Sequence, residues 1–150
     1  MIHFPDTSFL CALYRTQVNS NLSDAYMTDL IGPLSISSLL LLEFRQSVRL
    51  QIRLHFNDRT KGFPQNEGQQ MLRDLQVDLN SGILSVLPVA WADVHQRAES
   101  LSGKHTLAGG HRLADILHVA TALHLGVSEF LTFDGNQRNL AEAEGLIVPL

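Results

Sequence analysis

Short apolar runs alternate with longer segments of helical periodicity along the 150-residue chain. The apolar runs predict strands at residues 2–5, 34–37, 83–89, 129–134 and 146–150. Apolar residues spaced three or four apart predict helices at residues 7–18, 21–32, 39–56, 69–80, 91–103, 111–126 and 136–145. Polar, turn-rich sequence predicts a loop at 57–68, and the LAGG stretch at 107–110 predicts another junction. This alternation predicts an α/β fold with helices packed around a short, mostly parallel sheet.

The composition predicts one globular domain rather than a disordered chain, because 45% of the residues are hydrophobic and 17% are charged. No apolar run reaches the ~20 residues that a membrane helix needs. The N-terminus lacks the pattern of a signal peptide, and Cys11 is the single cysteine, so we expect a cytoplasmic protein. Cys11 lies in an apolar context, and we interpret it as a packed residue rather than a nucleophile.

The net charge of -4 excludes a polycation that coats nucleic acid without specificity. Five of the eleven lysines and arginines nevertheless lie between residues 45 and 61. Any surface that binds phosphates must therefore be local.

Four carboxylates stand where a site is expected. Ligands of parallel α/β sheets bind beyond the carboxyl ends of the strands, and Asp6 and Asp134 end the first and fourth predicted strands. Glu43 and Asp115 interrupt apolar helical faces, where an unpaired carboxylate is unfavourable. These four side chains are the candidates for chemistry.

Each acid also has a purely structural explanation. Asp6 and Asp134 could cap the helices that follow them. Glu43 could pair with an arginine or face solvent. Asp115 could pair with Arg112, three residues earlier on the same helix. Taken singly, none of the four is evidence of a site.

Taken together, the four acids share one chemistry. Carboxylates gathered at one edge of a sheet repel one another, and such a cluster persists only if protons or a cation neutralise it. Mg²⁺ and Mn²⁺ prefer carboxylate and water oxygens. An ion held in this way can activate a water and stabilise the charge on a phosphodiester. The pattern predicts metal-dependent hydrolysis of a nucleic-acid backbone.

Four stretches carry a resemblance to a known family: PDTSFLCAL (5–13), LSISSLLLLEFRQ (34–46), RLADILHVATALHLG (112–126) and FLTFDGNQRNLAEAEGL (130–146). In this order they closely resemble the VapC-type toxin ribonucleases, PIN-domain proteins of bacterial toxin–antitoxin pairs. The resemblance covers nearly the whole chain. It implies one PIN-like nuclease domain over residues 1–150, built as a three-layer α/β/α sandwich, that hydrolyses RNA phosphodiester bonds.

The resemblance also implies roles for individual residues. It implies a catalytic acidic site made of Asp6, Glu43, Asp115 and Asp134. Within this site Asp6, Asp115 and Asp134 would bind Mg²⁺ or Mn²⁺, and Glu43 would act mainly through water or a second metal.

Further positions would support these acids. Ser8 is similar to the small polar residue that helps to position the family's site, and Thr132 matches the hydroxyl residue that supports the last strand's acid. Asn136 falls where relatives sometimes carry another acid, which leaves a second metal position open. Gln137 stands near the place where many relatives have an aromatic residue.

Basic residues supply candidate contacts to RNA. Arg45, Arg49 and Arg53 recur every four residues along the helix that also carries Glu43. Such a ridge suits a phosphate backbone, and Arg112 is a further candidate. The alternative is a solvated helix face. No aromatic cluster for stacking bases is evident.

The seven histidines include no zinc-protease motif. His118 and Asp115 are three residues apart and share a helical face, but a di-iron site requires a second such pair, which the chain lacks. We interpret His118 as a packed residue or as a support for a site residue.

The resemblance further implies an antitoxin that wraps the toxin and blocks its site, and a homodimer formed through helices. No feature points to a membrane partner. One alternative function is a catalytically inactive PIN-like module that binds RNA or protein. Another is a phosphotransferase of the haloacid-dehalogenase type with Asp6 as nucleophile, although Ser8 stands where that chemistry usually has a second acid.

Overall fold

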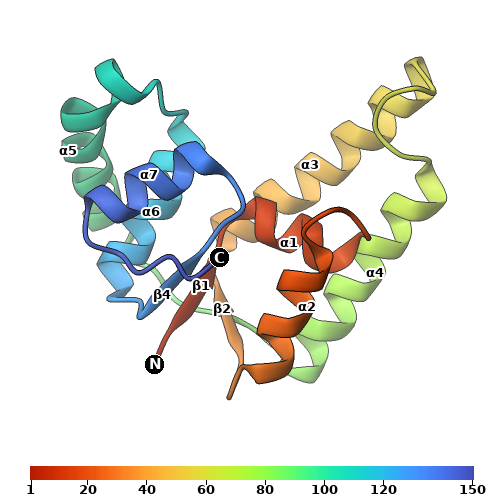
Figure 1. Ribbon diagram of the computed structural model, residues 1–150, viewed down its shortest axis with the longest axis horizontal. Helices are drawn as coiled ribbons and strands as arrows, with labels where there is room; N and C mark the ends of the chain where they lie inside the picture. Colours follow the sequence, from red (N-terminus) through yellow and green to blue (C-terminus); the bar gives the residue numbers. More distant parts are fainter.

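The computed structural model describes residues 1–150, and short strands lie at its centre between helices (Figure 1). The strands are β1 (His3–Pro5), β2 (Leu34–Ile36), β3 (Leu84–Val86) and β4 (Glu129–Leu131). The helices are α1 (Thr7–Tyr14), α2 (Ser20–Asp29), α3 (Ser38–Asn57), α4 (Gln65–Ser81), α5 (Trp91–Gly109), α6 (Leu113–Leu125) and α7 (Gly135–Ala143).

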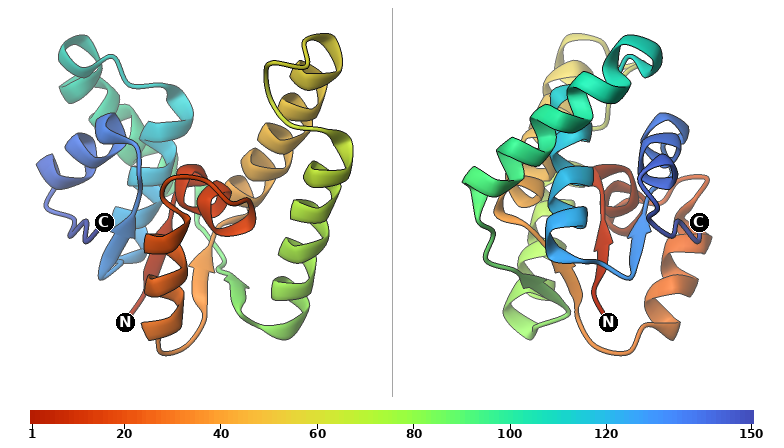
Figure 2. Two further views of the ribbon diagram at one scale, coloured as in Figure 1. Left: turned by 45° about the vertical axis from the view of Figure 1, so that its right-hand side comes forward. Right: turned by 90° about the vertical axis from the view of Figure 1, so that its left-hand side faces the viewer.

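All strand pairing is parallel. β1 pairs with β4, β2 pairs with β3, and β1 lies beside β2, so the strands are ordered β3-β2-β1-β4. Helices flank the strands on both sides, and the α3–α4 pair diverges from α5 (Figures 1 and 2). The predicted α/β/α sandwich with a short parallel sheet is therefore confirmed.

Large aromatic side chains hold β1 and β4 in register. Phe4 and Phe130 are register partners, both are fully buried, and their rings stack with centroids 6.4 Å apart. Phe9 on α1 and Phe44 on α3 are also fully buried in the same apolar core. The core thus fixes the positions of the residues that follow these two strands.

The first helix is shorter than predicted. It ends at Tyr14 rather than near Val18. The Ser20 hydroxyl accepts a hydrogen bond from the Gln17 N–H (2.8 Å) and donates one to the Ala12 carbonyl (2.7 Å). These bonds stabilise a turn where the apolar pattern alone predicts a continuing helix.

Two helix boundaries also differ from the prediction. α4 begins at Gln65, so the loop predicted at 57–68 is shorter, and α5 continues through Gly103 to Gly109. Gly110 ends α5 with a φ of 64°, a left-handed conformation that glycine adopts without strain. Gly103 therefore lies within α5 and does not end it.

The predicted strand at 146–150 is wrong. The segment makes one backbone hydrogen bond with β4, from the Phe130 N–H to the Ile147 carbonyl (2.8 Å). Pro149 has no N–H to donate, which prevents a continuous ladder.

Two expectations from the composition can be compared with the fold. Cys11 is partly buried and packs against the core, in agreement with a packing role. None of the helices has both the length and the apolar composition that crossing a membrane would require.

Gln137 on α7 is 1% exposed, and neither of its side-chain amide atoms has a hydrogen-bond partner. Because an unpaired buried polar group is destabilising, we expect Gln137→Met to raise the free energy of unfolding by about 1 kcal/mol. Urea denaturation measures the change. Asn139→Met, on the exposed face of α7, is the matched control and should change stability by less than about 0.5 kcal/mol. A less stable Gln137→Met protein would contradict the assignment of an unpaired amide.

Candidate active site

Asp6 lies where β1 and β4 end side by side. Its backbone N–H donates to the Leu131 carbonyl (2.9 Å), which extends the pairing of the two strands. Its carboxylate caps α1, because Oδ1 accepts a hydrogen bond from the Phe9 N–H (3.1 Å). The side chain is only 5% exposed. Asp6 is therefore both a helix cap and an acid at the carboxyl end of a strand.

Two hydroxyl groups from distant parts of the chain bind the Asp6 carboxylate. Ser8 Oγ donates to Oδ1 (2.6 Å), and Thr132 Oγ1 donates to Oδ2 (2.5 Å). Ser8 Oγ in turn accepts the Phe133 N–H (2.9 Å), and Thr132 Oγ1 accepts the Asp134 N–H (3.0 Å). This network attaches Asp6 to the segment that carries Asp134.

Burial raises the pKa of Asp6 above its ordinary value. Hydrogen bonds from Ser8, Thr132 and the Phe9 N–H oppose this effect, as does the charge of His118 when that residue is protonated, but burial dominates. The ionised carboxylate is thus supported by three donors and still lacks a full compensating charge.

Asp134 and Asp115 begin two neighbouring helices. Asp134 is exposed and caps α7, with Oδ1 accepting the Gln137 N–H (2.9 Å). Asp115 lies in the first turn of α6. Its pKa is raised first by burial and then by the negative charges of Asp134 and Glu43. The fold therefore brings Asp134 and Glu43 within electrostatic reach of Asp115.

The ion pair between Asp115 and Arg112 that was the structural alternative does not form, because no nitrogen and oxygen of the two side chains come within 4.0 Å. The positive charge of Arg112 nevertheless lowers the pKa of Asp115 and partly offsets the neighbouring acids. Arg112 precedes α6 at its N-cap position. It therefore remains close to the acids without neutralising Asp115.

Glu43 reaches this region from α3 and is held at both oxygens. Thr7 Oγ1 donates to Oε1 (2.7 Å), and His118 Nε2 lies 2.7 Å from Oε2. A carboxylate can only accept, so His118 donates through Nε2–H. Burial alone would raise the pKa of Glu43, but His118 and Thr7 together lower it below its ordinary value. The partner of Glu43 is thus a histidine, not the arginine or solvent considered from the sequence.

Sequence reasoning did not assign Thr7 to the site, and it interpreted His118 as a packed or supporting residue without identifying Glu43 as its partner. Thr7 lies one residue after Asp6, where its side chain resembles a simple capping residue. His118 is 1% exposed, in agreement with a packed supporting residue. Its spacing from Asp115 on α6 was the one available signal. Asn136 is exposed in the first turn of α7 and makes no side-chain hydrogen bond.

Arg45, Arg49 and Arg53 recur every four residues along α3, on a different face of the helix from Glu43. Arg45 donates to Gln76 on α4 (3.1 Å), and residues two apart on a helix do not share a face. Arg49 is exposed and makes no ion pair. Arg53 is exposed as well. Of the four predicted phosphate contacts, Arg112 is the one whose charge acts on one of the acids, Asp115.

The donor set can be tested for its fit to a metal ion. No three His, Cys, Asp or Glu side chains lie close enough together to hold an ion among them. Mg²⁺ needs less than that, because it commonly binds through one or two carboxylates and retains several waters. Asp6, Asp115 and Asp134 supply the right oxygen donors. Burial raises the pKa of Asp6 and of Asp115, so an added positive charge would favour their ionised forms. The residues therefore fit a hard cation by their chemistry, without a preformed cage.

Comparison with known proteins gives one family. The model of the PIN domain family matches residues 3–143. Among curated protein sequences, none matches the chain.

Several solved structures share the fold. VapC20 of Mycobacterium tuberculosis, a toxin that cleaves the sarcin–ricin loop, has a TM-score of 0.68 at 18% identity, over 97% of this chain and 96% of that one. FitAcB from Neisseria gonorrhoeae has a TM-score of 0.60 at 18% identity, over 98% and 96%. VapBC2 from Rickettsia felis, bound to a DNA fragment from their promoter, has a TM-score of 0.61 at 14% identity, over 99% and 97%.

The repulsion at Asp115 predicts a stabilising substitution. We expect Asp115→Asn to raise the melting temperature of the metal-free protein by a few degrees near neutral pH, because it removes a charge that Asp134 and Glu43 repel. The folded pKa of Asp115 lies above its unfolded value, so its ionisation destabilises the fold as the pH rises through the folded pKa. The gain should therefore shrink as the pH falls below that pKa.

Calorimetry over a pH series measures this effect. Asp24→Asn, an exposed acid on α2, is the matched control and should leave the melting temperature unchanged. Identical melting temperatures for the wild type and Asp115→Asn across the series would exclude the repulsion.

The contact between His118 and Glu43 leads to a prediction about the pKa of Glu43. We expect His118→Leu to raise the pKa of Glu43, because burial is then opposed by Thr7 alone. His118→Gln, which can keep a neutral donor, should raise it less. Carbon-13 NMR of the side-chain carboxyl groups follows the titration, and an unchanged Glu43 pKa in His118→Leu would disprove the coupling.

Proposed function

The chain belongs to the PIN-domain family, and we propose that it is a metal-dependent endoribonuclease, a single nuclease domain that acts as the toxin of a toxin–antitoxin pair. The observation that supports this proposal is an oriented carboxylate, Asp6, at the carboxyl end of β1, together with three further acids whose charges interact at Asp115. Asp6 is fixed there by Ser8 and Thr132, and Asp115 has its pKa raised by Asp134 and Glu43.

The topology supports a ligand site at this edge. β1 lies between β2 and β4. The chain passes from β1 to β2 on one side, and β4 pairs with β1 on the other side. In open α/β sheets, ligands bind in the crevice beyond the strand ends at such a point. Asp6 follows β1 and Thr132 follows β4, so their side chains meet at this edge of the sheet.

Asp6, Asp115 and Asp134 are the residues that would hold Mg²⁺ or Mn²⁺. When bound, such an ion lowers the pKa of a water and neutralises charge on the phosphate. Ser8 and Thr132 orient the Asp6 carboxylate, and Asp134 is tied to the same network through its backbone N–H. These hydrogen bonds thus orient the Asp6 carboxylate and connect it to the backbone of Asp134.

Glu43 is suited to a different task. Its lowered pKa keeps it ionised, and Thr7 and His118 restrict its orientation. An ionised carboxylate beside the metal-binding acids can accept a proton from the attacking water. Arg112 carries a positive charge near Asp115 and is our candidate for contacting the scissile phosphate.

Exposed apolar side chains support the proposed protein partners. Leu50 and Leu54 are 48% and 43% exposed and lie two and three turns beyond Glu43 on the same face of α3. This stripe leads from the acids along the helix, and it suits an amphipathic segment of an antitoxin that blocks the site.

A second apolar surface suits a homodimer. A hollow of about 320 Å³ lies between α3, α5 and α6, and its lining includes Leu42, Trp91 and Leu117. Leu42 is 63% exposed. Because exposed apolar patches commonly mark protein contacts, we expect a second copy of the chain to cover this surface.

The decisive experiment is RNA cleavage by purified protein with Mg²⁺ or Mn²⁺, with and without chelator. We expect cleavage by the wild type that chelation abolishes and added metal restores. Asp6→Asn and Asp115→Asn should each lose at least about 100-fold in rate, because each removes a charged donor from the acidic site. Asp24→Asn is the matched control and should cleave like the wild type.

Circular dichroism establishes that the variants are folded. Equal cleavage by the wild type, Asp6→Asn and Asp115→Asn would refute the acidic-site mechanism. RNA binding without cleavage in every metal would instead favour the inactive binding module.

A further inference from the structure

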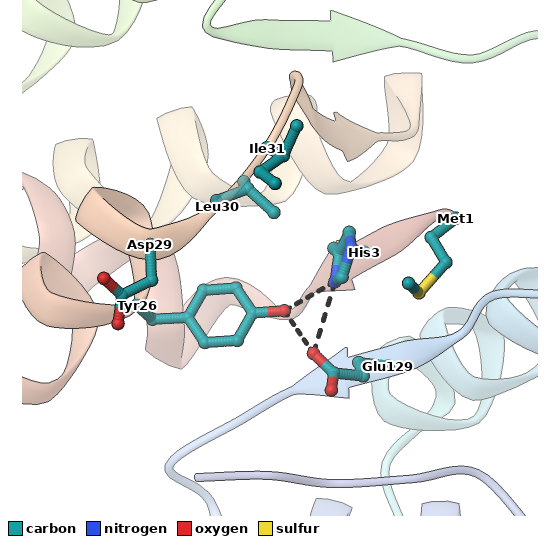
Figure 3. A pocket seen from close by; sticks show the side chains of 7 residues that line it. All are labelled: Met1, His3, Tyr26, Asp29, Leu30, Ile31 and Glu129. Atoms are coloured by element: carbon teal, nitrogen blue, oxygen red, sulfur yellow. Dashed lines mark hydrogen bonds and ion pairs between the residues drawn. The ribbon is translucent and has the colours of Figure 1, made fainter.

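A separate cavity of about 600 Å³ opens at the opposite edge of the sheet (Figure 3). His3 and Glu129 begin β1 and β4 and are register partners, whereas the acids lie beyond the other ends of these strands. The cavity shares no residue with the candidate active site. Its volume is within the range of sites for small molecules, roughly 300–1,000 Å³.

The carboxylate of Glu129 lines this cavity and is oriented by two side chains. Tyr26 Oη donates to Glu129 Oε2 (2.5 Å), and His3 Nδ1 lies 2.6 Å from Tyr26 Oη and 3.2 Å from Glu129 Oε2. In Figure 3 these three side chains, from α2, β1 and β4, point toward one another. All of the contacts use Oε2, so Oε1 has no protein partner, and the Glu129 side chain is 30% exposed.

The walls of the cavity limit the kind of ligand it suits. Leu30 and Ile31 contribute aliphatic surface, and Tyr26 contributes an aromatic ring. Asp29 adds a second acid to the lining, which also includes the N-terminal residue Met1 but no lysine or arginine. An anionic ligand would be repelled by the two carboxylates. A cation with a hydrocarbon part would satisfy Glu129 Oε1, the aromatic ring and the aliphatic wall together.

We propose that this cavity binds a small organic cation, an alkylammonium or alkylguanidinium, with its charge on Glu129 and its hydrocarbon part against Leu30 and Ile31. The site is independent of the proposed ribonuclease activity. Because the cavity is built from α2, β1 and β4 and exists only in the folded chain, a bound cation stabilises the folded state.

Titration of the full chain with n-pentylammonium chloride, followed by proton–nitrogen NMR, tests the site. We expect saturable shifts at His3, Tyr26 and Glu129, and a melting temperature that rises with ligand concentration. 1-Pentanol and pentanoate match the probe in size but lack its positive charge, and they should bind at least about fivefold more weakly.

Variants locate the interaction. Glu129→Gln should weaken pentylammonium binding at least about fivefold, and Asp29→Asn should weaken it less. If Glu129→Gln proves unstable, Asp29→Asn provides the test, since its side chain makes no hydrogen bond in the fold. Asp24→Asn on the same helix lies outside the cavity and should bind normally.

Three outcomes would overturn the proposal: no saturable binding of pentylammonium, equal binding of pentanol or pentanoate, or unchanged affinity in both cavity variants. Agmatine, a free alkylguanidinium, is the control for an arginine side chain. If an arginine-containing peptide binds more tightly than both agmatine and pentylammonium, the site binds a side chain of a protein partner instead. These results do not depend on RNA cleavage, so either proposal can fail alone.

Discussion

The hydrogen bonds from Ser8 and Thr132 to the Asp6 carboxylate are the constraint on which the acidic site depends. A buried carboxylate is unfavourable unless donors satisfy it, and these two donors lie 124 residues apart in the chain. They meet because Phe4 and Phe130 hold β1 and β4 in one register. A slip of one residue would turn Thr132 to the other face and remove its hydroxyl from Asp6. Core packing and site geometry are therefore parts of one arrangement.

The acids are alike in chemistry but differ in environment. Burial leaves Asp6 and Asp115 with raised pKa values, whereas the hydrogen bonds of Glu43 to His118 and Thr7 lower its pKa. Two kinds of carboxylate thus stand side by side, one that favours added positive charge and one that is already stabilised as an anion. Separation of this kind is how neighbouring acids take different tasks in catalysis. It supports the proposed division between metal-binding acids and Glu43.

Most of the fold could be predicted from the sequence, because apolar periodicity reports directly on burial. The sequence pattern predicted β1 to β4 and all seven helices in the correct order, and most of the errors concern where an element begins or ends. α1 stops early because Ser20 binds backbone groups at 12 and 17, which no periodicity reveals. The predicted strand at 146–150 has the apolar composition of a strand, but Pro149 interrupts its hydrogen bonding. The arginine spacing on α3 was equally regular, yet Arg45 is engaged by Gln76 on α4.

The sequence by itself determined which carboxylates follow strands and which interrupt apolar helical faces, since both facts are local properties of the chain. Only the tertiary structure decided what surrounds each of them. The capping of α1 and a position at the sheet edge coincide in Asp6, and His118 rather than an arginine holds Glu43. The cavity at His3, Tyr26 and Glu129 likewise arises from three segments that the sequence does not connect. Hydrogen-bond partners and charge neighbours depend on distances across the fold, and periodicity along one helix or strand carries no information about those distances.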